Sequence, residues 1–315
     1  MKKLNIVVMG TTDFAVPALI SLINAGHQIK SVVCQPDRPN QRGKKIKYNA
    51  MKQKALDLDI PVFQPEKVRE ADSVSFLKTL DADFFVVAAY GQILSREVLD
   101  IPKYGCINIH GSLLPEYRGA APIHHAIIDG KSETGVTIMQ MDAGMDTGQM
   151  LKKGIIPITE KTTVGEMHDR LAMLGAELLP DVLDQIVEGT ICPEIQNEDL
   201  ATYADKVDKN TGKIDWKRST DQIIRLVNGT DPFPGAWTNI DGDVVKCFGP
   251  EKIEGDYPDC EPGTIIAADT RNGLIIKTAD SACRIGDIQV PGKRRMAAKD
   301  YFRGNVFEVG MKCGF

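Results

Sequence analysis

The stretch that decides the fold is Leu4–Gly26, which runs LNIVVMGTTDFAVPALISLINAG. Its first part, up to Gly10, is apolar apart from Asn5 and rich in β-branched side chains, a pattern typical of a buried strand. From Asp13 onward the apolar residues recur at helical spacing until Gly26, and this predicts a helix over 13–25. A buried strand followed at once by a helix is the repeating unit of α/β proteins.

The same alternation continues through the first part of the chain. Further strands are predicted at 29–34, 84–89, 106–110, 136–141 and near 154–157, and further helices at 50–58, near 73–80, 120–128 and 164–187. Such alternation favours a mostly parallel sheet with helices on both faces, so we expect a Rossmann-like α/β fold. Gly10-Thr11-Thr12 lacks the G-x-G-x-x-G fingerprint, which disfavours a nicotinamide oxidoreductase on this sheet.

The character of the sequence changes after Gly189. A short polar segment is followed by one helical stretch at 220–227 and by strand patterns at 236–240, 243–248, 263–267, 274–278 and 283–290. Short strands separated by turns predict a small β-barrel of the OB type. We therefore predict a first domain over 1–189, a linker over 190–206 and an OB-like domain over 207–315.

Composition narrows the class of protein. Hydrophobic residues make up 43% and charged residues 26%, as in ordinary globular proteins, and the net charge is −5. This acidic balance argues against a whole-protein electrostatic grip on nucleic acid, and no DNA partner is expected. No stretch approaches the roughly 20 apolar residues of a membrane span, and the first apolar run ends before signal-peptide length. We expect a cytoplasmic protein without a membrane partner.

Two basic runs stand out from this acidic background. Residues 38–54 contain seven cations and no acid, and residues 293–303 contain five cations and one acid. A single such run is usually a solvated face of the protein. Two of them on one acidic chain favour a phosphate-bearing partner that is held by local patches.

The densest chemical signal is the string INIHGSLLP over residues 107–115. Because alternate residues of a strand share a face, Asn108 and His110 should project together at its carboxyl end, where ligands bind in doubly wound sheets. A glycine-bracketed turn, DAGMDTG over 142–148, follows another predicted strand. It places Asp146 near the same edge of the sheet.

An amide, an imidazole and a carboxylate suit acyl transfer to an amine. The tetrahedral oxyanion needs donors, which Asn108 and His110 supply, and the amine must lose a proton. Asp146 can orient the imidazole and raise its affinity for a proton, or accept the amine proton through a water. No G-x-S-x-G elbow supplies a nucleophile, and no cysteine sits in a comparable motif. Direct transfer between two bound substrates is therefore favoured. The seven cysteines form no C-x-x-C pair and no histidine has metal-ligand spacing, so no metal is expected.

The N-x-H-x-S-L-L-P string with a downstream D-x-G-x-D-T-G resembles the folate-dependent formyltransferases. The resemblance implies transfer of a formyl group from 10-formyltetrahydrofolate to an amine, with Asn108, His110 and Asp146 as the catalytic residues. It also implies a folate site made of three segments. The residues it assigns to that site are Ala89, Tyr90, Gln92, Ile93, Leu94, Ser112, Leu113, Leu114, Pro115, Asp142 and Gly144.

The full length of the chain is similar to the family members that formylate initiator methionyl-tRNA. The similarity includes QPDRP at 35–39, YADK at 203–206 and IDW at 214–216, whereas IKYN at 46–49 departs from the family pattern. It implies catalysis by the first domain and tRNA binding by the insertion after the second strand, the linker and the barrel. The cations it assigns to tRNA are Arg42, Lys44, Lys45, Lys206, Lys293, Arg294 and Arg295.

Two alternatives stay open at this point. One is a formyltransferase that acts on a sugar-nucleotide or another small amine and uses the C-terminal barrel for a different purpose. The other is a catalytically inactive RNA-binding relative, against which the intact Asn108, His110 and Asp146 argue.

Overall fold

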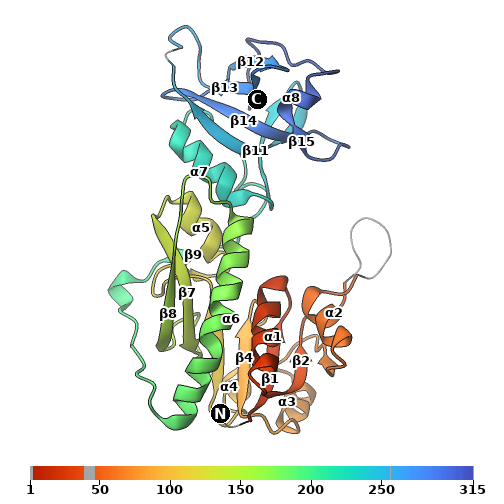
Figure 1. Ribbon diagram of the computed structural model, residues 1–315, viewed down its shortest axis with the longest axis vertical. Coiled ribbons are helices and arrows are strands. Elements are labelled where there is room, and N and C mark those ends of the chain that lie inside the picture. The colour runs from red at the N-terminus through yellow and green to blue at the C-terminus, as the bar shows by residue number, and fades with distance from the viewer. Residues whose placement is uncertain (1–2, 39–46, 256, 315) are drawn as a thin grey trace. The chain divides into compact units, whose positions relative to one another are not determined.

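A computed structural model describes residues 3–38, 47–255 and 257–314 of the chain (Figure 1). The chain folds into two compact units whose segments interleave along the sequence. The first comprises Met1–Gly119, Thr134–Ile156 and His168–Tyr203, and the second comprises Ala120–Glu133, Pro157–Met167 and Ala204–Phe315. The boundaries drawn from the sequence at 189 and 206 stay a prediction about where catalysis and tRNA binding reside.

The first unit is built on a seven-stranded sheet with the order β3-β2-β1-β4-β5-β7-β8. β3, β2, β1, β4 and β5 pair in parallel, and β7 runs antiparallel to β5. The predicted mostly parallel α/β sheet is confirmed. The strands are Asn5–Gly10 (β1), Gln28–Val33 (β2), Val62–Phe63 (β3), Phe84–Ala88 (β4), Cys106–His110 (β5), Glu133–Gln140 (β7) and Met150–Pro157 (β8).

Helices cover both faces of this sheet, as its continuously apolar strands require. On one face, Val7 of β1 and Phe85 of β4 share a buried cluster with Leu77 of α3 and Val98 of α4. On the other face α1 and α6 lie side by side (Figure 1), and the Ser21 hydroxyl donates to the Ala176 carbonyl at 2.6 Å. The helices are α1 (Val16–Asn24), α2 (Ala50–Asp57), α3 (Ala71–Lys78), α4 (Arg96–Leu99) and α6 (Val164–Glu188), and the short 3-10 turns are Asp13–Ala15 and Glu198–Leu200.

The second unit combines helices with an antiparallel sheet of the order β10-β11-β14-β13-β12, onto which β15 adds beside β14. The end of the chain links the two edge strands. Ile265 N donates to Met311 O at 2.8 Å, and Gly314 N donates to Asn239 O at 2.9 Å. The sheet therefore curves around one apolar core, which includes Trp216. The elements are α5 (Pro122–Ile128), α7 (Thr220–Thr230), β10 (Ala236–Ile240), β11 (Asp243–Ile253), β12 (Ile265–Asp269), β13 (Gly273–Lys277), β14 (Ala282–Gln289), β15 (Met296–Ala297) and α8 (Ala298–Tyr301).

Three short strands, Val62–Phe63, Arg118–Gly119 and Tyr203–Ala204, were not predicted from the sequence. β3 has only two residues, too few for a periodic pattern to predict. A second short strand, β6 (Arg118–Gly119), pairs with β9 (Tyr203–Ala204) and brings the segment after α6 back toward the end of β5. These pairings join distant parts of the sequence, so no local pattern announces them.

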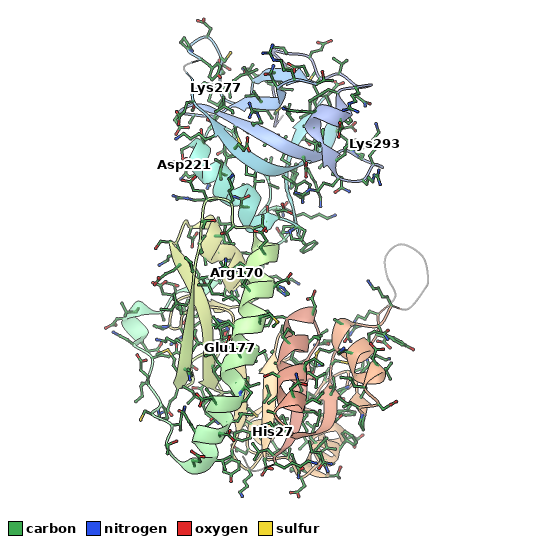
Figure 2. All side chains as sticks on the ribbon, viewed as in Figure 1. His27, Arg170, Glu177, Asp221, Lys277 and Lys293 are labelled. Atoms are coloured by element: carbon green, nitrogen blue, oxygen red, sulfur yellow. The ribbon has the colours of Figure 1, made fainter. Side chains whose placement is uncertain are left out.

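His27, labelled in Figure 2, lies in the turn between α1 and β2 and is 6% exposed. Its two ring nitrogens find no hydrogen-bond partner among the described residues. Burial lowers the pKa of its imidazole below the ordinary value of 6.5, although the negative charge of Asp184 opposes this shift.

We expect His27 to make the fold less stable in mild acid. Below pH 6.5 the imidazole of the unfolded chain becomes protonated, whereas that of the folded chain stays neutral until its lowered pKa is reached. The free energy of unfolding is therefore highest above pH 6.5 and decreases as the pH falls from 6.5 to the lowered pKa. The loss is about 1.4 kcal/mol for each unit by which the pKa is lowered. Chemical denaturation at pH 7.5 and pH 5 should show a smaller loss for His27→Leu than for the wild type. Equal losses in the two proteins would contradict this expectation.

Candidate active site

The carboxyl end of β5 presents two polar side chains on one face. Asn108 pairs across the sheet with Met139 of β7, and His110 pairs with Thr137. Alternation puts both polar side chains on the same face, opposite Ile109. They are mostly buried, with exposed fractions of 9% for Asn108 and 6% for His110. The structure thus brings together the two residues that the strand pattern predicted as neighbours.

The Asn108 side chain is available to a ligand. In the part of the chain that the structure describes, its amide makes no hydrogen bond, and neither polar atom is sealed away from solvent. β5 holds the residue between two paired strands. A donor fixed in a central strand and left without a protein partner is preorganised for charge that develops on a substrate.

Thr137 fixes the loop that follows β5. Its hydroxyl donates to Ser112 O at 2.7 Å and accepts from Leu114 N at 3.1 Å. The Ser112 hydroxyl in turn donates to Glu116 O at 2.6 Å. Leu114 packs in a small apolar cluster with Met139 and Met150. The turn beside Asn108 and His110 is therefore a rigid wall of the site.

His110 lies between a carbonyl and a carboxylate. Its Nε2 is 3.0 Å from Tyr117 O, and its Nδ1 is 3.7 Å from Asp146 Oδ2. Because a carbonyl only accepts, Nε2 carries a hydrogen and donates it to Tyr117. In the neutral imidazole Nδ1 is then the acceptor. The Nδ1 atom therefore faces the Asp146 carboxylate.

Asp146 is held by one of its two carboxylate oxygens. Oδ2 accepts from Gly119 N at 2.8 Å, and the other oxygen makes no hydrogen bond with the residues that the structure describes. The backbone has a φ of 55°, in the left-handed region, which costs a side-chain-bearing residue about 1 kcal/mol. Oδ2 also lies nearest the imidazole, and the other oxygen is left free, so Asp146 can accept a proton directly or through a water.

A buried arginine and a glutamine support the Asp146 turn. Arg118 is fully buried and donates through Nε and Nη2 to Gln196 Oε1 at 3.0 and 2.8 Å. Gln196 donates through Nε2 to Asp146 O at 2.7 Å and Gly148 O at 2.8 Å. Two further bonds of 2.8 Å join Arg118 to Glu198, and they hold the pKa of that carboxyl below its usual range.

Sequence reasoning missed these supporting residues. Arg118 lies three residues after the 107–115 string, and this position was the only signal for it. Gln196 lies 78 residues away from Arg118 in a polar segment without a motif. Only the fold brings the two side chains together.

The residues assigned to folate after β4 fall into two groups. Tyr90 and Leu94 are buried in the apolar cluster between the sheet and α3 and α4. To a folate site they can contribute only backbone groups and the shape of the loop. Ile93 is 80% exposed. Gln92 ties the loop to the neighbouring segment, because its Oε1 accepts from Val68 N at 2.8 Å. Ala89 is exposed at the end of the strand.

The other residues assigned to folate form two turns. Ser112 and Leu114 are buried, and Leu113 and Pro115 are half-buried. In the second turn, Asp142 Oδ1 accepts from Gly144 N at 3.0 Å and from the Thr147 hydroxyl at 2.7 Å. This Asx-type turn shapes the backbone that leads into Asp146.

A cavity of about 370 Å³ adjoins the loop after β4. Its walls include Lys67 and Arg69, which make it attractive to an anion, and Glu66, which partly offsets their charge. The lining residues are Gln35, Glu66, Lys67, Arg69, Gly91, Gln92 and Ile93.

The cations assigned to tRNA differ in how free they are. Arg42, Lys44 and Lys45 lie outside the described residues. Lys206, Lys293 and Arg294 are exposed. Arg295 pairs with Asp231 at 2.8 Å and with Asp287 at 2.9 Å, and its guanidinium lies 4.1 Å from the centre of the Phe248 ring. These contacts engage Arg295 within its own unit.

Two kinds of feature are absent from the described residues. Within them, no helix is long and apolar enough to cross a membrane. In the same ranges, no group of three or more His, Cys, Asp or Glu side chains is arranged to hold a metal ion.

Structural comparison finds the same fold in other proteins. HypX from Aquifex aeolicus in complex with tetrahydrofolic acid matches with a TM-score of 0.68 and 18% identity over 99% of this chain, which spans about half (51%) of HypX. WlaRD, a sugar 3N-formyl transferase, matches with a TM-score of 0.63 and 19% identity over 93% of this chain and 100% of that chain. At these identities the likeness establishes the fold alone.

Sequence comparison goes further. The formyl transferase family model matches residues 2–183, and the model of the formyl transferase C-terminal domain matches residues 206–306. A methionyl-tRNA formyltransferase of Geobacter metallireducens is 44% identical over 100% of both chains. One from Bacillus subtilis is 42% identical over 98% of this chain and 97% of its own. The chain therefore belongs to the formyl transferase family, in which these full-length relatives are methionyl-tRNA formyltransferases.

Proposed function

We propose that this enzyme transfers the formyl group of 10-formyltetrahydrofolate to the amino group of initiator methionyl-tRNA. The observation that carries the proposal is the convergence of Asn108, His110 and Asp146 at the carboxyl end of β5. The acceptor is proposed because the whole chain aligns with methionyl-tRNA formyltransferases. An acceptor of this kind would place the reaction in the cytoplasm.

In the proposed reaction the amine nitrogen attacks the formyl carbon and forms the new C–N bond. The carbonyl oxygen becomes an oxyanion, for which the unpartnered Asn108 amide is a ready donor. Asp146 takes the proton that the amine loses, directly or through a water, and the imidazole Nδ1 of His110 faces the same carboxylate. The bond between the formyl carbon and folate N10 then breaks, and that nitrogen receives the proton.

The cysteine nearest in sequence supports direct transfer. Cys106 lies on the same face of β5 as Asn108, two residues earlier, but it is 1% exposed. Burial raises the pKa of its thiol to about 12, so the nucleophilic thiolate is scarce at neutral pH. A covalent acyl-enzyme at this residue is disfavoured.

The folate is proposed to lie along the loop after β4 and the turns at 112–115 and 142–144. Folates carry glutamate carboxylates, and the cavity beside Gln92 has Lys67 and Arg69 in its wall. These two cations would attract the carboxylates while the pterin lies closer to His110. This placement would separate the charged glutamate tail of the folate from the end that carries the formyl group.

The test of the proposal is an acceptor comparison with purified protein and 10-formyltetrahydrofolate. The acceptors are initiator methionyl-tRNA, elongator methionyl-tRNA and a deoxythymidine diphosphate amino sugar. Formylmethionine on the initiator tRNA is expected. Formylation of the amino sugar alone would favour a small-amine enzyme, and tRNA binding without any product would favour an inactive RNA-binding relative.

The basic run offers a separate prediction about the acceptor. Changing Arg42, Lys44 and Lys45 to Gln should weaken tRNA binding and flatten the plot of log affinity against log salt by about one for each phosphate that the variant no longer neutralises. The control changes Lys3, Lys78 and Lys103 to Gln, because these exposed cations lie in segments that lead into the amino ends of the parallel strands β1, β4 and β5. Filter binding at several salt concentrations measures both slopes. Equal slopes in the two variants would argue against a tRNA contact by the basic run.

A further inference from the structure

We propose that Gln196 is a positioning residue that sets the Asp146 turn for catalysis. The inference rests on the proposed function, in which the Asp146 carboxylate handles the amine proton. Among the described residues, the Gln196 side chain makes no hydrogen bond with the His110 ring or with the Asp146 carboxylate. It acts on the backbone, through bonds of 2.7 and 2.8 Å to the carbonyls of Asp146 and Gly148.

The orientation of the Gln196 amide is fixed by its neighbours. Arg118 has only donors, so the atom that accepts from its Nε and Nη2 must be the amide oxygen. Both hydrogens of the amide nitrogen are then left for the two carbonyls, which only accept. The Gln196 side chain thus takes part in four hydrogen bonds, and together they allow only one orientation of its amide.

This arrangement holds a turn that is unfavourable by itself. Asp146 has a φ of 55°, and its carboxylate must point toward Gly119 N and His110. Gln196 is 5% exposed and Arg118 is fully buried, so little water can replace their bonds. Strained backbone of this kind persists only where the surroundings over-determine it. Without the Gln196 amide, the turn keeps the Gly119 bond but loses the two that fix its backbone.

Two variants separate positioning from packing. Gln196→Met keeps the volume and removes all four hydrogen bonds. Gln196→Glu keeps an acceptor for Arg118 but places a carboxylate oxygen against the two carbonyls. It therefore removes only the hydrogen bonds to Asp146 O and Gly148 O. The control is Asn197→Ala in the same segment, whose side chain accepts from Asp199 N and contacts no part of the turn.

We expect both Gln196 variants to lower kcat by about ten- to a hundredfold, the scale of moving a catalytic group by about an ångström. The KM values for folate and tRNA should stay within about threefold of the wild type, because no binding contact is removed. Asn197→Ala should keep the wild-type kcat. If Gln196→Met does not fold, Gln196→Glu carries the test.

A merely structural role is separated by combining Gln196→Glu with Asp146→Asn. If Gln196 acts through Asp146, adding Gln196→Glu to Asp146→Asn should lower kcat by less than about a further threefold. A loss in kcat below tenfold in a folded Gln196 variant, or the same fold loss in both backgrounds, would overturn the inference. If Asp146→Asn itself has wild-type kcat, the role proposed for the Asp146 carboxylate has failed. The proposed function fails only if the wild-type enzyme makes no formylmethionyl-tRNA, so the failures are distinguished.

Discussion

The Asp146→Asn variant is expected to fold and to bind both substrates, but to transfer formyl groups at least about a hundredfold more slowly, the usual scale for loss of a general acid or base. Its amide oxygen can still accept from Gly119 N, as Oδ2 does now at 2.8 Å. The turn therefore keeps its shape. The amide cannot take the amine proton, and it has no negative charge to offer His110.

Steady-state kinetics with saturating folate and initiator methionyl-tRNA measures the loss in kcat. Asp199→Asn is the matched control, because Asp199 is an exposed carboxylate in the first unit with no contact to the turn. It should behave as the wild type. Near-normal turnover by Asp146→Asn would remove this carboxylate from the mechanism.

Replacing Gly148 by Ala is expected to damage both stability and catalysis. A Cβ at this position would lie 1.8 Å from Gln140 O, a backbone atom of a residue at the end of β7 that pairs with Ile107 of β5. Backbone cannot yield as a flexible side chain does, so either β7 or the turn must shift. Overpacking of this kind costs about 1–3 kcal/mol. Because Gly148 O also accepts from Gln196, the shift should reach Asp146 and lower kcat.

Chemical denaturation and kcat measured on the same preparation test the Gly148→Ala prediction. Gly304→Ala is the control, since a Cβ at Gly304 would meet no heavy atom within 4 Å. That variant should stay within about 0.5 kcal/mol of the wild type, as surface substitutions usually do. Wild-type stability and turnover for Gly148→Ala would mean that the turn accommodates the extra methyl group without cost. That result would contradict a rigid Asp146 turn.

The sequence predicted the scaffold of the site because the scaffold follows periodic rules. The apolar run and helix within Leu4–Gly26 indicate an α/β sheet, and alternation alone puts Asn108 and His110 on one face. Asp146 was placed by its motif, and the structure brings it within 3.7 Å of His110.

The supports of the site could not be predicted in this way. Arg118, Gln196 and the pairing of β6 with β9 join segments far apart in the chain, and side-chain hydrogen bonds between such segments leave no periodic trace. The engagement of Arg295 by Asp231 and Asp287 is of the same kind. A basic run shows how many charges a segment carries, but not which of them are already paired.

The most direct measurement of direct transfer at the Asn108, His110 and Asp146 site is a single-turnover rapid-quench experiment with formyl-labelled 10-formyltetrahydrofolate and initiator methionyl-tRNA. The label is expected to pass from folate to the aminoacyl-tRNA without residing on the protein, and Asn108→Ala, His110→Ala and Asp146→Asn should each slow that single step. Label bound covalently to the protein during the wild-type turnover, or an unchanged single-turnover rate in all three variants, would contradict the account.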